Sequence, residues 1–196
     1  MKNLRSCNFS FILFAETHGY LNDSKIITRL IKQQKPDYVL YELAEDKEFL
    51  TPKEFEAVLK QSKLSEMTDI KDIKNVLKIC YRLHIPIIGI DLKNFGIKDT
   101  KTVREKNENK EAPAEEEMKE FMQILTKREQ HQIRLIKEYQ KKGKILVITG
   151  AFHLREDSPL WKELKDVLII YPSYKNKIVL EPNVKKQRIV YKTKKQ

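Results

Sequence analysis

Cysteines and long apolar runs are scarce in this chain of 196 residues. Its two cysteines, Cys7 and Cys80, match neither a disulfide framework nor the paired spacing of a zinc site. No stretch approaches the roughly 20 apolar residues that a membrane-spanning helix needs. The basic start and short apolar run of residues 1–15 resemble a weak signal peptide, but no small-residue cleavage site follows. We therefore predict a cytoplasmic protein with reduced thiols and no transmembrane segment.

The composition is that of a globular protein with a heavily charged surface. Hydrophobic residues make up 40% of the chain and charged residues 34%, which excludes the disordered and membrane classes. The length suits one domain with one core. We predict a single domain over residues 1–184, followed by a basic tail over residues 185–196.

The predicted tail holds six lysines and arginines and no acid, so it supplies more than half of the net charge of +11. A solvated tail and a contact with phosphates or a membrane surface both explain such a run. Aromatic residues are sparse in it, and no nucleic-acid recognition module is visible in the sequence. Binding of nucleic acid is therefore the least favoured function.

Apolar runs of strand length alternate with segments of helical periodicity. Near-continuous apolar runs are typical of parallel strands covered on both faces, and the alternation is typical of βαβ units. We predict an α/β fold with a central, largely parallel sheet flanked by helices. The four long runs span residues 8–15, 37–43, 85–92 and 144–150, and shorter strands are expected at 166–171, 177–181 and 188–192.

The helical segments are amphipathic at residues 22–34, 69–83 and 158–166. The segment 100–117 is highly charged and is interrupted by Pro113, so we predict a mobile excursion there. Such an excursion either acts as a lid or is simply disordered. It leads into a long helix that is expected to end near residue 142, before the last long strand.

Four predicted strands carry an acid or a histidine at their carboxyl ends, which is the edge where ligands bind in open α/β sheets. Glu16 and His18 follow the first strand, Glu42 the second, Asp91 the third and His153 the fourth. The spacing of two residues directs Glu16 and His18 to the same side if the strand continues that far. Each histidine is alternatively a hydrogen-bonded structural residue, and Asp91 equally suits a turn.

The long helix adds Arg128, which lies within its apolar arc. An arginine on a core-facing surface pairs with a carboxylate or an anionic ligand. The alternatives are a side chain that extends along the edge of the apolar arc to water, and a purely structural ion pair with Glu42.

These segments, taken in order, resemble the signature of the TraB/PrgY and Tiki group, whose relatives include the erythromycin esterase-like and ChaN-like proteins. The resemblance covers residues 9 to about 155 and is carried by AETH at 15–18, YEL at 41–43, KREQHQIRLI at 127–136 and GAFH at 150–153. It implies an α/β fold, and its members include metal-dependent proteases, esterases and a haem-binding lipoprotein.

By resemblance, the active-site positions are matched by His18, Glu42, Arg128 and His153, with Glu16 as a fifth. The chain departs from the group at Ala15, which stands where a glycine usually opens the first motif, so the backbone approaches a ligand less closely there.

Two mechanisms suit these residues. In the first, His18, Glu42 and His153 bind a divalent ion such as Mn²⁺, Co²⁺ or Zn²⁺ that activates water, and Glu16 serves as general base or supports the ligands. In the second, His18 activates water without a metal, oriented by Glu16 or Glu42, while Arg128 and His153 stabilise the oxyanion.

The favoured function is hydrolysis of an ester or amide bond in a small-molecule or peptide substrate. The alternative is a non-catalytic ligand-binding or signalling protein that holds a metal, haem or an anionic small molecule at the same edge. The sequence leaves the substrate, the metal and the oligomeric state open.

Overall fold

A computed structural model describes residues 10–17, 21–109, 112–174, 177–178 and 189–191. Its strands form one sheet in the order β3-β4-β2-β5-β1-β6-β7, and β8 also pairs with β6. The strands are β1 (Phe11–Glu16), β2 (Tyr38–Tyr41), β3 (Glu48–Phe49), β4 (Ile87–Gly89), β5 (Ile145–Gly150), β6 (Leu168–Tyr174), β7 (Lys177–Ile178) and β8 (Ile189–Tyr191).

The central strands β4, β2, β5, β1 and β6 are parallel to their neighbours, as is β8 to β6. Among the described strands, only the short β3 and β7 pair antiparallel, with β4 and β6 respectively. The predicted α/β fold with a largely parallel sheet is therefore confirmed. Strand β8 lies where a short strand was expected at residues 188–192, within the segment 185–196 that was also predicted to be a basic tail. Its residues Ile189, Val190 and Tyr191 are of types that favour strands.

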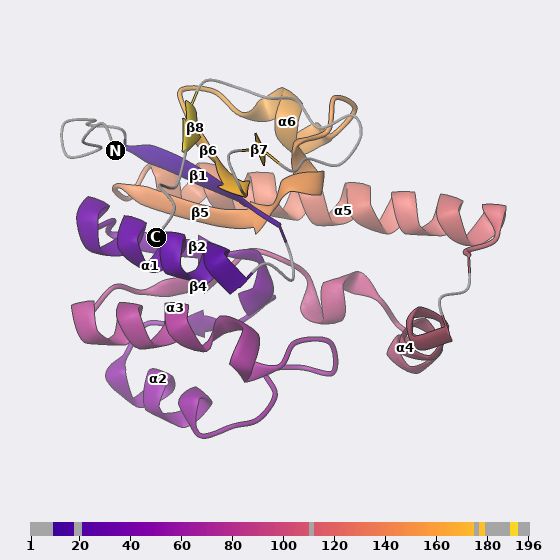
Figure 1. Cartoon of the computed structure of the whole chain (residues 1–196), viewed down its shortest axis with the longest axis horizontal. Coiled ribbons are helices and arrows are strands. Elements are labelled where there is room, and N and C mark those ends of the chain that lie inside the picture. The colour runs from indigo at the N-terminus through magenta and orange to yellow at the C-terminus, as the bar shows by residue number, and fades with distance from the viewer. Residues whose placement is uncertain (1–9, 18–20, 110–111, 175–176, 179–188, 192–196) are drawn as a thin grey trace.

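Helices cover both faces of the sheet (Figure 1). Along β1, Ile12 and Phe14 join the core formed with α1, α2 and α3, whereas Phe11 and Leu13 join the core formed with α5 and α6. This alternation explains why the strands read as continuous apolar runs, since both of their faces are buried. The helices are α1 (Leu21–Gln34), α2 (Pro52–Leu59), α3 (Ile70–Leu83), α4 (Thr100–Asn109), α5 (Glu115–Gln140) and α6 (Pro159–Glu163).

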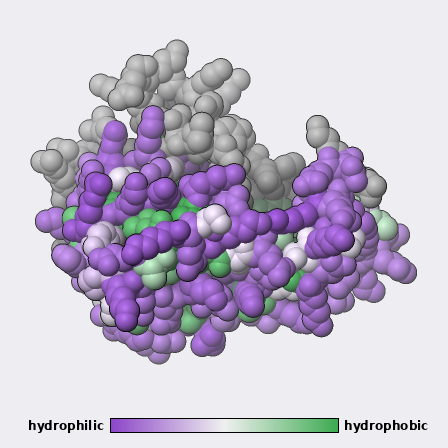
Figure 2. Space-filling model, turned by 90° about the horizontal axis from the view of Figure 1, so that it is seen from below, coloured by the Kyte–Doolittle hydropathy of each residue, from purple (hydrophilic) through white to green (hydrophobic). Residues whose placement is uncertain are grey.

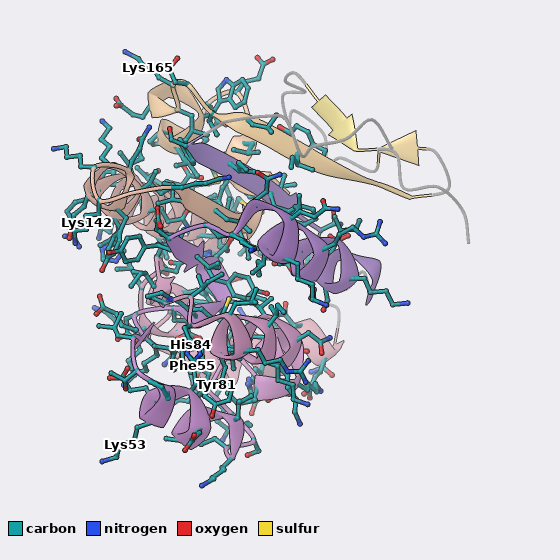
Figure 3. The ribbon with its side chains drawn as sticks, turned by 90° about the vertical axis from the view of Figure 1, so that its left-hand side faces the viewer. Lys53, Phe55, Tyr81, His84, Lys142 and Lys165 are labelled. Carbon is teal, nitrogen blue, oxygen red and sulfur yellow. The ribbon has the colours of Figure 1, made fainter. Side chains whose placement is uncertain are left out.

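Two elements differ from the expectation. The first is helix α2, which the sequence did not predict. It begins at a capping box in which the backbone N–H groups of Leu50 and Thr51 donate to Glu54. Its Phe55 packs against Tyr81 of α3 (Figure 3). The segment 100–117, expected as a mobile excursion that is either a lid or disordered, contains α4 and the start of α5. The lysine, arginine, glutamate and alanine residues of this segment have high helix propensity, although it lacks an apolar face.

Helix α5 continues past the carboxyl ends of the strands toward α4 (Figure 1). Seen from the α2 side, the surface is mainly hydrophilic, with apolar residues in small separate patches (Figure 2). None of the helices in the described part of the chain combines the length and the apolar composition that a membrane span requires.

Candidate functional site

Three side chains converge at the carboxyl edge of the sheet. Glu42 follows β2, Asp91 follows β4 and His153 follows β5, and these strands are neighbours in the sheet. One potential ligand atom from each residue lies within 4.8 Å of the others, and all three residues are buried. The cluster therefore presents two carboxylates and one imidazole to a common point.

Glu42 is held from both sides of its carboxylate. It opens the short 3-10 helix η2 (Glu42–Ala44), and its Oε2 accepts hydrogen bonds from Thr149 Oγ1 at 2.8 Å and Gly150 N at 2.5 Å. Its Oε1 lies 2.8 Å from Arg128 Nη2 and 3.1 Å from His153 Nε2. One oxygen thus fixes the side chain to β5, and the other faces the centre of the cluster.

Arg128 reaches the cluster from α5. Its Nη2 donates to Asp91 Oδ2 at 2.7 Å and its Nε donates to Asp91 Oδ1 at 3.0 Å, so the two groups form a bidentate pair. The guanidinium also lies 5.0 Å from the centroid of the Phe95 ring, and Gln132 Nε2 donates to Asp91 at 3.2 Å. The side chain therefore points at two buried carboxylates and does not extend along the helix surface to water.

His153 lies between two carboxylates. Its Nε2 is near Glu42, and its Nδ1 is 3.1 Å from Oε1 of Glu129, which is fully buried on α5. Burial lowers the pKa of His153, but the Glu42 carboxylate and the hydrogen bonds to Glu129 and Glu42 raise it more strongly, to about 9. Glu129 is held in turn by Arg155 and by Ser158 Oγ at 2.9 Å.

The charges of this buried network balance. Three acids face three groups that carry positive charge once His153 is protonated, so the network stays buried without an excess charge. The acids are Glu42, Asp91 and Glu129, and the cationic groups are Arg128, His153 and Arg155.

Glu16 ends β1 and lies opposite Gly150 in the sheet register, next to the backbone that holds Glu42. Burial raises the pKa of Glu16, and the carboxylates of Glu42 and Asp23 raise it further, to about 8. Glu16 and His18 were expected to point the same way only if the first strand continued to residue 18. Strand β1 ends at Glu16. His18 itself lies outside the described residues.

The structure thus brings Glu42, Arg128 and His153 together, with Glu16 beside them. The sequence did not predict that Glu129, Gln132, Arg155 and Ser158 belong to this site. A signal was present for two of them, because Glu129 and Gln132 are polar residues within the same helical arc as Leu125 and Ile136.

The chain is thus an α/β protein with a buried cluster of acids and a histidine at the carboxyl edge of a mostly parallel sheet. No protein-family model matches its sequence, and no curated protein matches it. One similar solved structure is the type III effector HopBA1, with 18% identity, a TM-score of 0.51, and coverage of 89% of this chain and 83% of that chain.

A second similar structure is that of ChaN of Campylobacter jejuni with cofacially bound haem, with 15% identity, a TM-score of 0.44, and coverage of 85% of this chain and 82% of that chain. At 18% identity, the likeness to HopBA1 shows the fold alone. Membership of the TraB/PrgY and Tiki group, or of its erythromycin esterase-like relatives, stays a prediction.

Proposed function

We propose that this protein is a hydrolase that cleaves an ester or amide bond in a small-molecule or peptide substrate, with a divalent metal at the carboxyl edge of the sheet. The observation that carries the proposal is the convergence of Glu42, Asp91 and His153, whose ligand atoms lie within 4.8 Å of one another. Asp91 takes the place in the ligand set that the sequence assigned to His18.

The residues fit a metal of this kind. Two carboxylate oxygens and one imidazole nitrogen suit Mn²⁺, Co²⁺ or Zn²⁺ and leave a position for water. Binding requires His153 to give up its proton, so metal affinity should rise with pH. The contact of His153 Nδ1 with Glu129 is the support that metal-binding histidines usually have. When bound, such an ion lowers the pKa of a water molecule and polarises the carbonyl of the substrate.

The remaining roles fall to residues beside the ligands. Arg128 carries a positive charge beside Glu42 and Asp91, and we assign to it the stabilisation of a developing oxyanion. Glu16 has a pKa raised to about 8, which lets it take up and release a proton near neutral pH as a general base. His18 remains in the proposal as a further ligand or base from the segment that follows β1.

The proposal is tested by thermal unfolding of the metal-free protein with and without Mn²⁺, Co²⁺ and Zn²⁺. A ligand that binds only the folded state stabilises it, by about 2.7 kcal/mol at a hundredfold excess over Kd. We expect one of these ions to raise the Tm of the wild type by several degrees but not to raise that of Asp91→Asn or His153→Ala. His131→Ala, on the outer part of α5, is the matched control and should respond like the wild type.

Turnover is then measured with panels of esters and peptides in the presence of that ion. Loss of hydrolysis in His153→Ala with retained hydrolysis in His131→Ala supports the proposal. An equal rise in Tm for all four proteins would show that the ion binds elsewhere. Glu129→Gln keeps the three ligands and removes the negative charge that faces His153 and Arg155, so we expect its metal affinity to fall by about 10- to 100-fold.

A second candidate is a non-catalytic protein that binds a ligand at the same edge. The balanced charges favour it, because the buried acids are already paired with Arg128, Arg155 and His153 and need no ion to remain buried. Saturable binding of a small molecule at this edge, without turnover in either panel, would support this candidate over the hydrolase.

A further inference from the structure

A second concave site lies outside the buried cluster, between α4 and the turn that joins α2 to α3. It is an open cavity of about 430 Å³, within the range of small-molecule sites. Its wall contains three cationic side chains, two hydroxyl groups and one acid, from Lys63, Ser65, Glu66, Thr100, Lys101 and Arg104.

Cationic side chains outnumber acids in the wall of this cavity by three to one. Its one acid, Glu66, accepts a hydrogen bond from Thr100 Oγ1 at 2.5 Å. Within the described part of the chain, neither Lys63 nor Arg104 forms an ion pair, and Lys101 makes an exposed contact of 3.9 Å with Glu105 and lies near the exposed Asp99. Like charges that line one hollow repel each other, so an anion between them is favourable.

The cations come from two separate segments. Lys101 and Arg104 are three residues apart on α4 and so share a face of that helix, while Lys63 approaches from the turn between α2 and α3. Cations that arrive from two segments surround a ligand, whereas a charged face of one helix is simply solvated. This arrangement differs from a general basic surface.

The wall beside Lys63 is held in a fixed shape by Glu45, a fully buried acid. One oxygen of Glu45 accepts hydrogen bonds from Ser65 Oγ and from Thr68 Oγ1 at 2.7 Å, and the other accepts one from Asn94 N at 2.6 Å. Ser65 Oγ also accepts hydrogen bonds from two backbone N–H groups of its own turn. A turn ordered in this way loses little further freedom when it binds a ligand.

We propose that this cavity binds an anionic small molecule through a phosphate or carboxylate group, with Lys63, Lys101 and Arg104 as its contacts. Charge-assisted hydrogen bonds from lysine and arginine are the strong contacts for both groups. This site goes beyond the proposed hydrolase function and does not depend on metal binding or turnover at the edge of the sheet.

The test is calorimetric titration of the full chain with inorganic phosphate, pyrophosphate and citrate, with chloride used to hold the ionic strength constant. We expect saturable binding of at least one of these anions, weakened about tenfold in Lys63→Gln and in Arg104→Gln, because each loses a charge-assisted hydrogen bond. Tighter binding of pyrophosphate identifies a phosphate site, and tighter binding of citrate identifies a carboxylate site.

Lys53→Gln is the matched control, because Lys53 lies on α2 and points away from the body of the molecule (Figure 3). It should bind like the wild type, and circular dichroism checks that every variant is folded. Binding that is equal in all these proteins, or absent from all of them, overturns the proposal. Loss of binding in His153→Ala, with Lys63→Gln unaffected, also overturns it, because the anion would then lie at the edge of the sheet.

Discussion

Glu16 lies at the end of a buried strand, next to two other acids. In water a glutamate is ionised at neutral pH, but here burial and the charges of Glu42 and Asp23 raise its pKa to about 8. A hydrogen bond with Tyr41 opposes this shift only in part. The folded protein therefore holds a proton on Glu16 that the unfolded chain releases above its ordinary pKa of 4.5.

This proton predicts how stability depends on pH. Between about pH 4.5 and about pH 8 the folded state binds more protons than the unfolded state, so the free energy of unfolding falls as pH rises. We expect Glu16→Gln to remove this part of the slope, which is at most about 1.4 kcal/mol per pH unit for one proton. Urea unfolding at several pH values measures it.

His153 makes a similar contribution, because its pKa is raised from the ordinary value of 6.5 to about 9. Between these pH values the free energy of unfolding falls as pH rises. The Glu16→Gln variant keeps this contribution. This contribution is the same in both proteins and cancels when their slopes are subtracted, so the slopes should differ from about pH 4.5 to about pH 8. Identical slopes in both proteins would show that Glu16 is ionised in the folded state.

Strand β4 passes close to the chain that leaves η2. A Cβ atom on Gly89 would lie 2.2 Å from the carbonyl oxygen of Glu45, so only glycine allows the strand and this loop to approach so closely. The same contact brings Gly89 N to Lys47 O at 2.7 Å and Asp91 N to Glu45 O at 3.0 Å. The position of Asp91 in the cluster thus depends on this crossing of two elements.

We expect Gly89→Ala to destabilise the protein by about 2 kcal/mol or more, because backbone atoms must move to admit the methyl group. Gly143→Ala is the comparison, because the three atoms nearest to its Cβ belong to the side chain of Asp37 and not to the backbone. The Asp37 carboxylate can move, at the cost of its hydrogen bond from Lys144 N. Urea unfolding compares the two variants. A loss for Gly89→Ala no greater than that for Gly143→Ala would mean that the loop after η2 adjusts easily.

The molecule as a whole is strongly basic, with a net charge of +11 and more than half of it in residues 185–196. Charge of this kind attracts polyanions without reading their sequence. It differs from the cavity beside α4, where three cations surround one hollow. The two features should therefore respond differently to salt and to substitution.

We expect any binding of duplex DNA to be independent of sequence and to fall steeply between about 50 and 200 mM salt. Replacing Lys192, Lys194 and Lys195 by glutamine, which leaves β8 in place, should reduce the salt dependence. Fluorescence anisotropy at several salt concentrations measures this. A control variant with the same net charge replaces the exposed lysines 53, 74 and 119 by glutamine and should reduce the salt dependence less. A larger reduction in the control variant would argue against the terminal segment as the contact.

The sequence by itself determined the α/β class and the sheet edge to which Glu42, Asp91 and His153 belong. The reason is that side-chain periodicity and strand length are local properties, and parallel strands place their carboxyl ends at one edge. Strands as short as β3, with two residues, carry too little periodicity to be found in this way.

Only the tertiary structure decided which residues are partners. Arg128 pairs with Asp91 and His153 contacts Glu129. These contacts depend on the order of β4, β2 and β5 in the sheet and on where α5 crosses these strands. The raised pKa of Glu16 likewise depends on acids 7 and 26 residues away in the chain, Asp23 and Glu42. Burial and the distances between charges are properties of the folded chain, and no local pattern contains them.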